Sequence, residues 1–277
     1  MSRYKVYRRW RRVGTEVMSA GCALCSGIIG QEELDEQLKG NGARRMFAAL
    51  SVSCMIAAGQ GAAEKTRVRW SPLLKLDSRK AIDERLARPF GDVFEGNAGG
   101  SKTSVANCND YLRWSEQGFH AGNEREQKVL HNDAVECVAL RMLRAARTPM
   151  TALLPGFKMT TATLSMLPPE LAPAVSNELI LKARAADAAG KSWATYIAEA
   201  AAKVVAEDQL EVSQPGWITR LSLYARGDFS GRGKEELLVR ADYQAQGGTY
   251  ATSHLFLLAR NESGAKRLQF VRQVVVH

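Results

Sequence analysis

The chain has 277 residues, of which 38 are basic and 29 acidic, and its formal net charge is +9. Residues 1–63 hold nine of the basic and five of the acidic residues, which leaves a net charge of +5 for residues 64–277. This mild excess, with acids and bases interleaved, argues against nucleic-acid binding, because such proteins gather Lys and Arg on one face. The apolar share of 45% excludes a disordered chain.

Residues 44–63 have the order of segments found in an export signal. Arg44 and Arg45 precede an apolar run from Met46 to Ala58, and small residues follow as far as Ala63. The run is too short to cross a bilayer, which takes about 20 apolar residues. We therefore expect cleavage near Ala63, a periplasmic or secreted protein, and no membrane span in the mature chain.

Residues 1–43 are unusual before a signal, and two interpretations stay open. In the first, translation starts downstream of Met1. In the second, these residues are the long leader of a twin-arginine signal, since Arg44-Arg45-Met46-Phe47 resembles the core R-R-x-F. Where these residues are made, we expect them to be disordered.

Two cysteines, Cys108 and Cys137, remain after the expected cleavage. An even number of cysteines in an exported protein favours a disulfide, because the compartment oxidises thiols. The bridge would close a loop of about 30 residues and stabilise the fold by roughly 3 to 4 kcal/mol. Two unpaired core cysteines are the alternative.

The first part of the exported chain is predicted to be mainly helical. Asp77 or Ser78 can cap a helix that Pro89 ends. Residues 91–101 are rich in Gly and Asn and are expected to form a loop.

A helical hairpin is expected next. Its first helix starts at Thr103 or Ser104 and reaches about Glu116, and its second starts at Asn123. The Cys108–Cys137 bridge would join the two helices at their apolar faces. The buried stripe of the second helix is predicted to comprise Leu130, Ala134, Cys137 and Leu140.

The same second helix carries His131 and Asp133. A metal site on a helix needs ligands four residues apart, and Val135 stands four residues after His131. We therefore interpret these two side chains as a solvated helix face.

Proline-rich residues 149–169 are expected to join the two halves and to hold one short strand. Two helices should follow, one over Glu170–Ala188 and one over Trp193–Asp208. The last sixty-odd residues change to β-branched and aromatic runs separated by turn signals. We expect four antiparallel strands with one face packed on the helices; the strands are 217–225, 236–243, 249–258 and 268–276.

The predicted fold class is accordingly α+β. A mainly helical part over residues 64–212 packs on a C-terminal β-meander over residues 213–277, and the two parts can form a single domain.

Residues Gly227–Val239 read G-D-F-S-G-R-G-K-E-E-L-L-V. This stretch resembles the hairpin G-D-F-x-G-D-G-x-x-D-L-L-V of FG-GAP and VCBS-type repeats, whose loop acids often hold calcium. It is also similar to uncharacterised exported proteins of proteobacteria that end in such a hairpin and a G-G-T-Y strand. The resemblance makes Asp228, Ser230 and Glu235 the candidate cation ligands.

The turn departs from the repeat at Arg232, where the family places an acid. A guanidinium cannot ligate a cation and repels it, and calcium needs several oxygen ligands. We therefore expect a structural turn in which Asp228 bonds loop amides and Arg232 pairs with an acid. No metal and no cofactor is predicted.

Two functions stay open at this point. The first is a non-catalytic periplasmic binding protein, for instance an immunity protein or inhibitor whose partner is another envelope protein. Its support is that no histidine, serine or cysteine stands in a triad or metal spacing. The second is a cell-envelope hydrolase whose catalytic acids come from distant loops. The sequence favours the first and nominates no catalytic residue.

Overall fold

The computed structural model describes residues 67–154, 156–262 and 264–276. They belong to one compact unit that spans Gln60–His277. The expected leader, 1–43, and the expected signal, 44–63, lie outside the described residues and stay predictions. In the part of the chain that the structure describes, no helix has the length and apolarity needed to cross a membrane.

The main sheet has seven strands, and six of them follow the order β10-β9-β8-β7-β6-β5, each antiparallel to its neighbours. A short strand, β1 (Arg69–Trp70), pairs with β7 off this path. The α+β class is confirmed, but the expected four-stranded meander is wrong because two more strands precede it. The six strands are β5 (Ala201–Ala206), β6 (Gln209–Gln214), β7 (Trp217–Gly227), β8 (Glu236–Ala245), β9 (Ala251–Ala259) and β10 (Gln269–Val274).

Strand β5 forms where the later part of the helix Trp193–Asp208 was expected, and β6 follows directly after it. The helix that forms there, α5, covers Trp193–Tyr196. In β6, Leu210 and Val212 are fully buried between partly exposed polar neighbours, a period of two that suits a strand. Because β6 pairs with β7, the Ala-rich β5 can add along its free edge. Strand pairing thus overrides the local preference of alanine for helix.

A second sheet has the strand order β3-β2-β4. Strands β2 (Pro89–Ala98) and β3 (Ser101–Asn107) form a hairpin, so the loop expected over 91–101 is wrong. The turn residues Gly99 and Gly100 both have positive φ, which two-residue hairpin turns require. Strand β4 (His120–Ala121) approaches β2 so closely that a Cβ on Gly96 would lie 2.1 Å from the His120 carbonyl oxygen.

Three helices accompany this second sheet. Helix α1 (Arg79–Ala87) begins after Ser78, whose hydroxyl accepts a hydrogen bond from the Ala81 amide. Helix α3 (Glu124–Ala145) begins after Asn123, whose side chain accepts one from the Glu126 amide. Both starts agree with the capping residues in the sequence. Helix α2 (Cys108–Ser115) begins later than expected, because Thr103 and Ser104 belong to β3.

The segment between residue 147 and β5 contains short helices. The expected strand between Pro149 and Pro169 is wrong, because Thr161–Ser165 forms a 3-10 helix, η2. Residues Pro169–Leu171 form another, η3, and α4 covers Asn177–Ala188 with Ser176 as its N-cap. Helix α4 therefore starts later than Glu170, since Pro173 lacks the amide hydrogen that a continuous helix needs.

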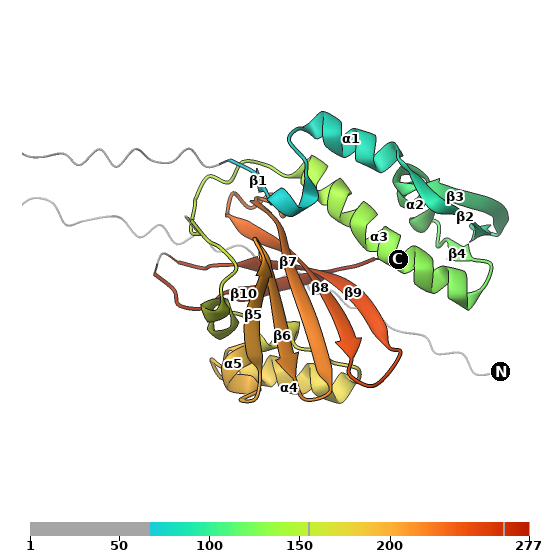
Figure 1. The fold of residues 1–277 in the computed structure, drawn as a ribbon. Coiled ribbons are helices and arrows are strands. Elements are labelled where there is room, and N and C mark those ends of the chain that lie inside the picture. The colour runs from blue at the N-terminus through green and yellow to red at the C-terminus, as the bar shows by residue number, and fades with distance from the viewer. Residues whose placement is uncertain (1–66, 155, 263, 277) are drawn as a thin grey trace, which may run out of the picture. The chain divides into compact units, whose positions relative to one another are not determined.

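Both faces of the main sheet are covered, whereas one covered face was expected. The side chains of Leu237 and Val239 enter a core with Leu164, Leu171 and Trp193 of the η2–α5 segment. The intervening Leu238 enters the core of α1, α2, α3 and the second sheet. Figure 1 shows α1, α2 and α3 grouped with β2–β4, and α4 and α5 near the other end of the strands. The period of two along β8 therefore places alternate residues in two different cores.

The expected disulfide joins α2 to α3. Cys108 and Cys137 are both buried, with a Cα–Cα distance of 5.0 Å and a sequence separation of 29 residues. Helix α3 also contributes Leu130, Ala134 and Leu140 to the same core, as the stripe predicts. The bridge thus fixes α3, the helix that lies against β9.

We predict that the double variant Cys108→Ala/Cys137→Ala unfolds at lower urea concentration than the wild type, with a loss of about 3 kcal/mol. The bridge restricts the unfolded chain, so its removal stabilises the unfolded state. Reduced wild-type protein is the matched control and should lose a similar amount. A variant as stable as the oxidised wild type would contradict this role.

Candidate functional site

A band of polar side chains crosses the main sheet on the face that α3 packs against. The register places Glu211 of β6 opposite Arg220 of β7, Arg220 opposite Asp242 of β8, and Asp242 opposite Ser253 of β9. Residues that pair directly across antiparallel strands point to the same face. Lys203 of β5 extends the row, because it pairs with Glu211. The row therefore alternates in charge from the free edge of β5 to β8.

A second polar row lies beside the first. Gln209 of β6 pairs with Ser222 of β7, and Ser222 pairs with Arg240 of β8. The Gln209 amide nitrogen donates to the Ser222 hydroxyl at 3.1 Å. A bulge between Leu223 and Ala225 shifts the register of β7 and brings Tyr224 to the same face.

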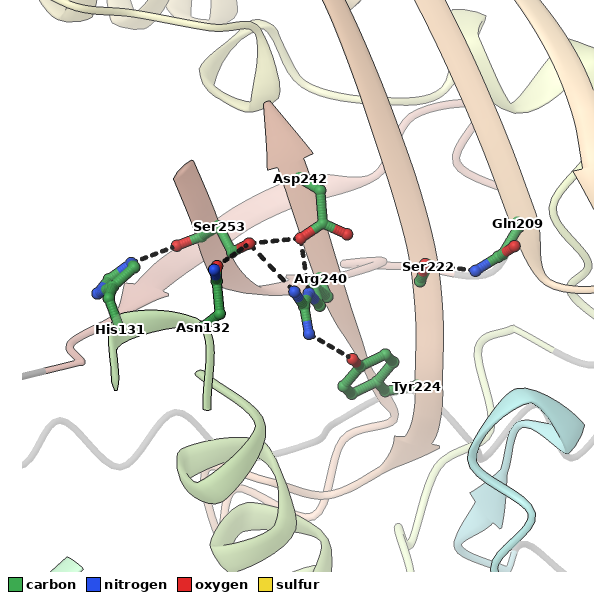
Figure 2. A network of polar contacts seen from close by, with 8 residues as sticks. All are labelled: His131, Asn132, Gln209, Ser222, Tyr224, Arg240, Asp242 and Ser253. Atoms are coloured by element: carbon green, nitrogen blue, oxygen red, sulfur yellow. Dashed lines mark hydrogen bonds and ion pairs between the residues drawn. The ribbon is translucent and has the colours of Figure 1, made fainter. Parts of the chain in front are cut away.

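Arg240 is the centre of the resulting network (Figure 2). Its Nε donates to Asp242 Oδ1 at 2.7 Å, and its Nη1 donates to the Tyr224 hydroxyl at 3.3 Å. Its Nη2 donates to the Ser253 hydroxyl at 3.1 Å. The Ser253 hydroxyl in turn donates to Asp242 Oδ1 at 2.5 Å. Arg240, Asp242 and Ser253 thus form a closed ring of hydrogen bonds, and Arg240 joins Tyr224 to this ring.

Helix α3 contacts this network at Ser253 of β9. His131 Nε2 lies 3.0 Å from the carbonyl oxygen of Ser253, and Asn132 Oδ1 lies 3.4 Å from the Ser253 hydroxyl. Figure 2 shows both side chains directed at Ser253. His131 and Asp133 are half-buried, so the expectation of a solvated helix face is wrong. The sequence spacing on one helix could not reveal a contact with a strand some 120 residues later.

Burial and neighbouring charge shift three pKa values in and beside the network. Burial raises the pKa of the Tyr224 phenol, which keeps its proton in the neutral range. Burial lowers the pKa of Arg240, but Tyr224 and Asp242 raise it, and the net change is upward. Burial, and then the nearby Glu136, raise the pKa of Asp133. Arg240 therefore stays charged, and Tyr224 stays a hydrogen-bond donor.

Two adjoining cavities lie over this face, and we call them together the groove. The larger has a volume of about 900 Å³ and is lined by α3, β7 and the β8–β9 connection. The smaller has a volume of about 440 Å³ and lies between the β6–β8 strands and the segment Leu73–Lys75. Arg220 and Asp242 line both cavities, so the two meet at these side chains.

The Ser253 hydroxyl is held within the network by an ion-paired carboxylate. A catalytic serine needs a base within hydrogen-bond reach of its hydroxyl. The Ser253 hydroxyl instead donates to a carboxylate that is paired with Arg240, and His131 contacts the Ser253 backbone carbonyl. The groups therefore hold one another in place, which gives the groove a fixed polar floor.

The hairpin residues nominated from the resemblance lie away from this groove, and they do not converge. Asp228 accepts hydrogen bonds from the Arg232 and Gly233 amides at 3.0 and 2.9 Å. Ser230 donates to Glu236 at 2.6 Å, whereas Glu235 accepts from the Leu154 amide at 2.8 Å. No group of three or more His, Cys, Asp or Glu side chains that could hold a metal occurs among the described residues.

The acid that completes this turn is Glu236, which is not among the candidate residues predicted from the sequence. Its side chain is fully buried and accepts from the Arg232 guanidinium at 2.6 Å and from the Phe229 and Ser230 amides. The turn also binds the segment that follows α3, because the Arg147 and Asp228 backbones exchange hydrogen bonds. The contacts of Asp228, Ser230, Glu235 and Glu236 are thus structural ones, and the expectation that the turn binds no cation stays a prediction.

A signal for the groove was present in the sequence of β8. The run E-L-L-V-R-A-D-Y places Arg240 and Asp242 two residues apart within an apolar strand. Charged residues are rarely buried unless paired, so such a pair on one strand face indicates a built polar site. Its partners in β7, β9 and α3 depend on register and packing, which the spacing alone does not determine.

Comparison of the chain with models of protein families, with curated proteins and with solved structures found no match. The resemblance of Gly227–Val239 to FG-GAP and VCBS-type hairpins therefore stays a proposal.

We predict strong coupling between Arg240 and Asp242. Arg240→Met should cost about 1–3 kcal/mol, because it leaves the Asp242 carboxylate partly buried without its cation. In a double-mutant cycle with Asp242→Asn, the coupling should exceed about 1 kcal/mol in urea unfolding. The exposed pair Lys80–Glu84 is the matched control, with an expected coupling below about 0.5 kcal/mol. Equal coupling in both pairs would show that the network does not hold the floor together.

Proposed function

We propose that the protein is an exported, non-catalytic binding protein that holds its ligand or partner in the groove. The observation that carries this proposal is the network of Arg240, Asp242, Ser253 and Tyr224 beneath the groove. Asp242 and Ser253 line the cavity of about 900 Å³, and Arg240, Tyr224 and Asp242 line the one of about 440 Å³. A rigid polar floor under an accessible cavity gives orientation and specificity to a bound molecule.

Apolar side chains on the rim of the groove add to this support. Tyr250 is 52% exposed and Val129 is 46% exposed, and both line the larger cavity. The Tyr250 ring packs edge-on against Trp217, with ring centroids 5.7 Å apart. An aromatic side chain held in place by a second ring is typical of interface anchors, because it loses little conformational entropy on binding.

Export is part of the proposal and rests on two observations. Residues 44–63 have the segment order of a signal, with cleavage expected near Ala63. The Cys108–Cys137 disulfide suits the oxidising periplasm or the cell exterior. In that compartment the partner would be another envelope protein, as for an immunity protein or an inhibitor.

A cell-envelope hydrolase is the alternative, and Asp133 is the observation that favours it. Its pKa is raised by burial and by Glu136, as a general acid requires. The acids that line the groove favour binding over hydrolysis. Glu124, Glu136 and Asp242 are each held in an ion pair with a cation.

Photo-crosslinking from the groove tests the proposal. The full chain is expressed in cells with p-benzoylphenylalanine at Tyr250, irradiated, and recovered from the periplasmic fraction. We predict one dominant adduct with an envelope protein, because Tyr250 lies on the groove rim. N-terminal sequencing of the adduct should place the mature end near Glu64.

Val93 is the matched control, because it is 60% exposed on the β2–β3 hairpin and lines neither cavity of the groove. The crosslinker at Val93 should give no such adduct. The same adducts from both positions, or none from Tyr250, would contradict groove binding. Release of sugar reducing ends from purified cell wall would favour the hydrolase instead.

A further inference from the structure

The smaller cavity of the groove, over Ser222 and Tyr224, is surrounded by an excess of positive charge. Four cationic side chains line it, and two carboxylates do so. Both carboxylates are engaged: Glu136 pairs with Arg85 at 2.7 Å, and Asp242 pairs with Arg240 at 2.7 Å. Arg220 shares Glu211 with Lys203, so two cations there face one acid. The four cations that line the cavity are Lys75, Arg85, Arg220 and Arg240.

The polar groups on the floor of this cavity have hydrogens to donate. Ser222 and Tyr224 are 4% and 8% exposed, and each hydroxyl accepts a hydrogen bond from a neighbour. A hydroxyl that accepts in this way still has its own proton to give. Among the described residues, no acceptor lies within hydrogen-bond geometry of the Ser222 or Tyr224 proton. The raised pKa of Tyr224 keeps its proton in place.

Lys75 is positioned by the backbone and not by an ion pair. The Ser71 amide donates to the Tyr224 carbonyl at 2.8 Å, which ties the segment before Lys75 to β7. Ser71 then caps the short helix η1 (Pro72–Leu74), and the Lys75 amide donates to the Pro72 carbonyl. Lys75 has φ of 50°, a conformation that is uncommon outside glycine. In the described part of the chain, its ammonium has no carboxylate within ion-pair distance.

We propose that this cavity binds an oxyanion, a carboxylate or phosphate group carried by the ligand of the groove. Hydroxyl protons, guanidinium hydrogens and an ammonium converge on it, and an oxyanion is the ligand whose oxygens accept from all of them. The rest of the ligand extends past Arg220 into the larger cavity, where Ile218, Val129 and Tyr250 offer apolar contact. This inference rests on the proposed function and names the chemistry of its ligand.

Isothermal titration of the purified protein tests the proposal, with inorganic phosphate and succinate as separate probes at constant ionic strength. We expect saturable binding of at least one probe. Lys75→Gln and Arg220→Gln should each weaken it at least fivefold, because each removes a cation that the oxyanion contacts. Lys102→Gln and Arg125→Gln are the matched controls, since both side chains are exposed and line neither cavity. Controls should bind within twofold of the wild type.

The two probes distinguish the sources of the oxyanion. Binding of phosphate alone assigns a phosphate-bearing ligand, and binding of succinate alone assigns a carboxylate. No saturable binding of either probe, or equal weakening in the controls, would overturn the inference. Crosslinking from Tyr250 would still succeed in that case if the groove binds a neutral partner, so the two proposals fail separately.

Discussion

The face of the main sheet that packs against α3 depends on Arg240, a charged residue in the apolar strand β8. A partly buried guanidinium needs partners on every side, because leaving one donor unpaired costs free energy. Asp242, Tyr224 and Ser253 supply these partners from three strands. The α3 side chains His131 and Asn132 then contact Ser253, which ties the helix to the same network. The position of α3 and the polar floor of the groove are therefore linked.

The two faces of the main sheet differ because of this charge. On the face towards η2 and α5, Leu237, Val239 and Ala241 of β8 enter an apolar core. On the face towards α3, Leu238 enters the core, but Arg240 and Asp242 follow it on the same side. Apolar packing can therefore cover one end of this face and not the other. The groove lies where packing ends, over the polar rows.

Short-range sequence signals predicted the elements that depend on short-range contacts. Ser78 and Asn123 begin α1 and α3 as their capping chemistry predicts, and the paired cysteines predict the disulfide. The expectation failed at β5, where alanine favours helix but strand pairing with β6 decides. The groove depends on register between residues such as Arg220 and Asp242, and on a contact from His131. Such long-range contacts leave no fixed spacing in the sequence.

Chemical-shift mapping tests the central role of the groove most directly. The isotopically labelled protein is titrated with phosphate and with succinate, and backbone amide and arginine Nε signals are followed. We predict that the largest shifts lie at Gln209, Arg220 and Ser222, on the polar rows of the groove. Shifts centred on Trp193 and Phe256, which are buried in the core of the opposite face, would contradict it.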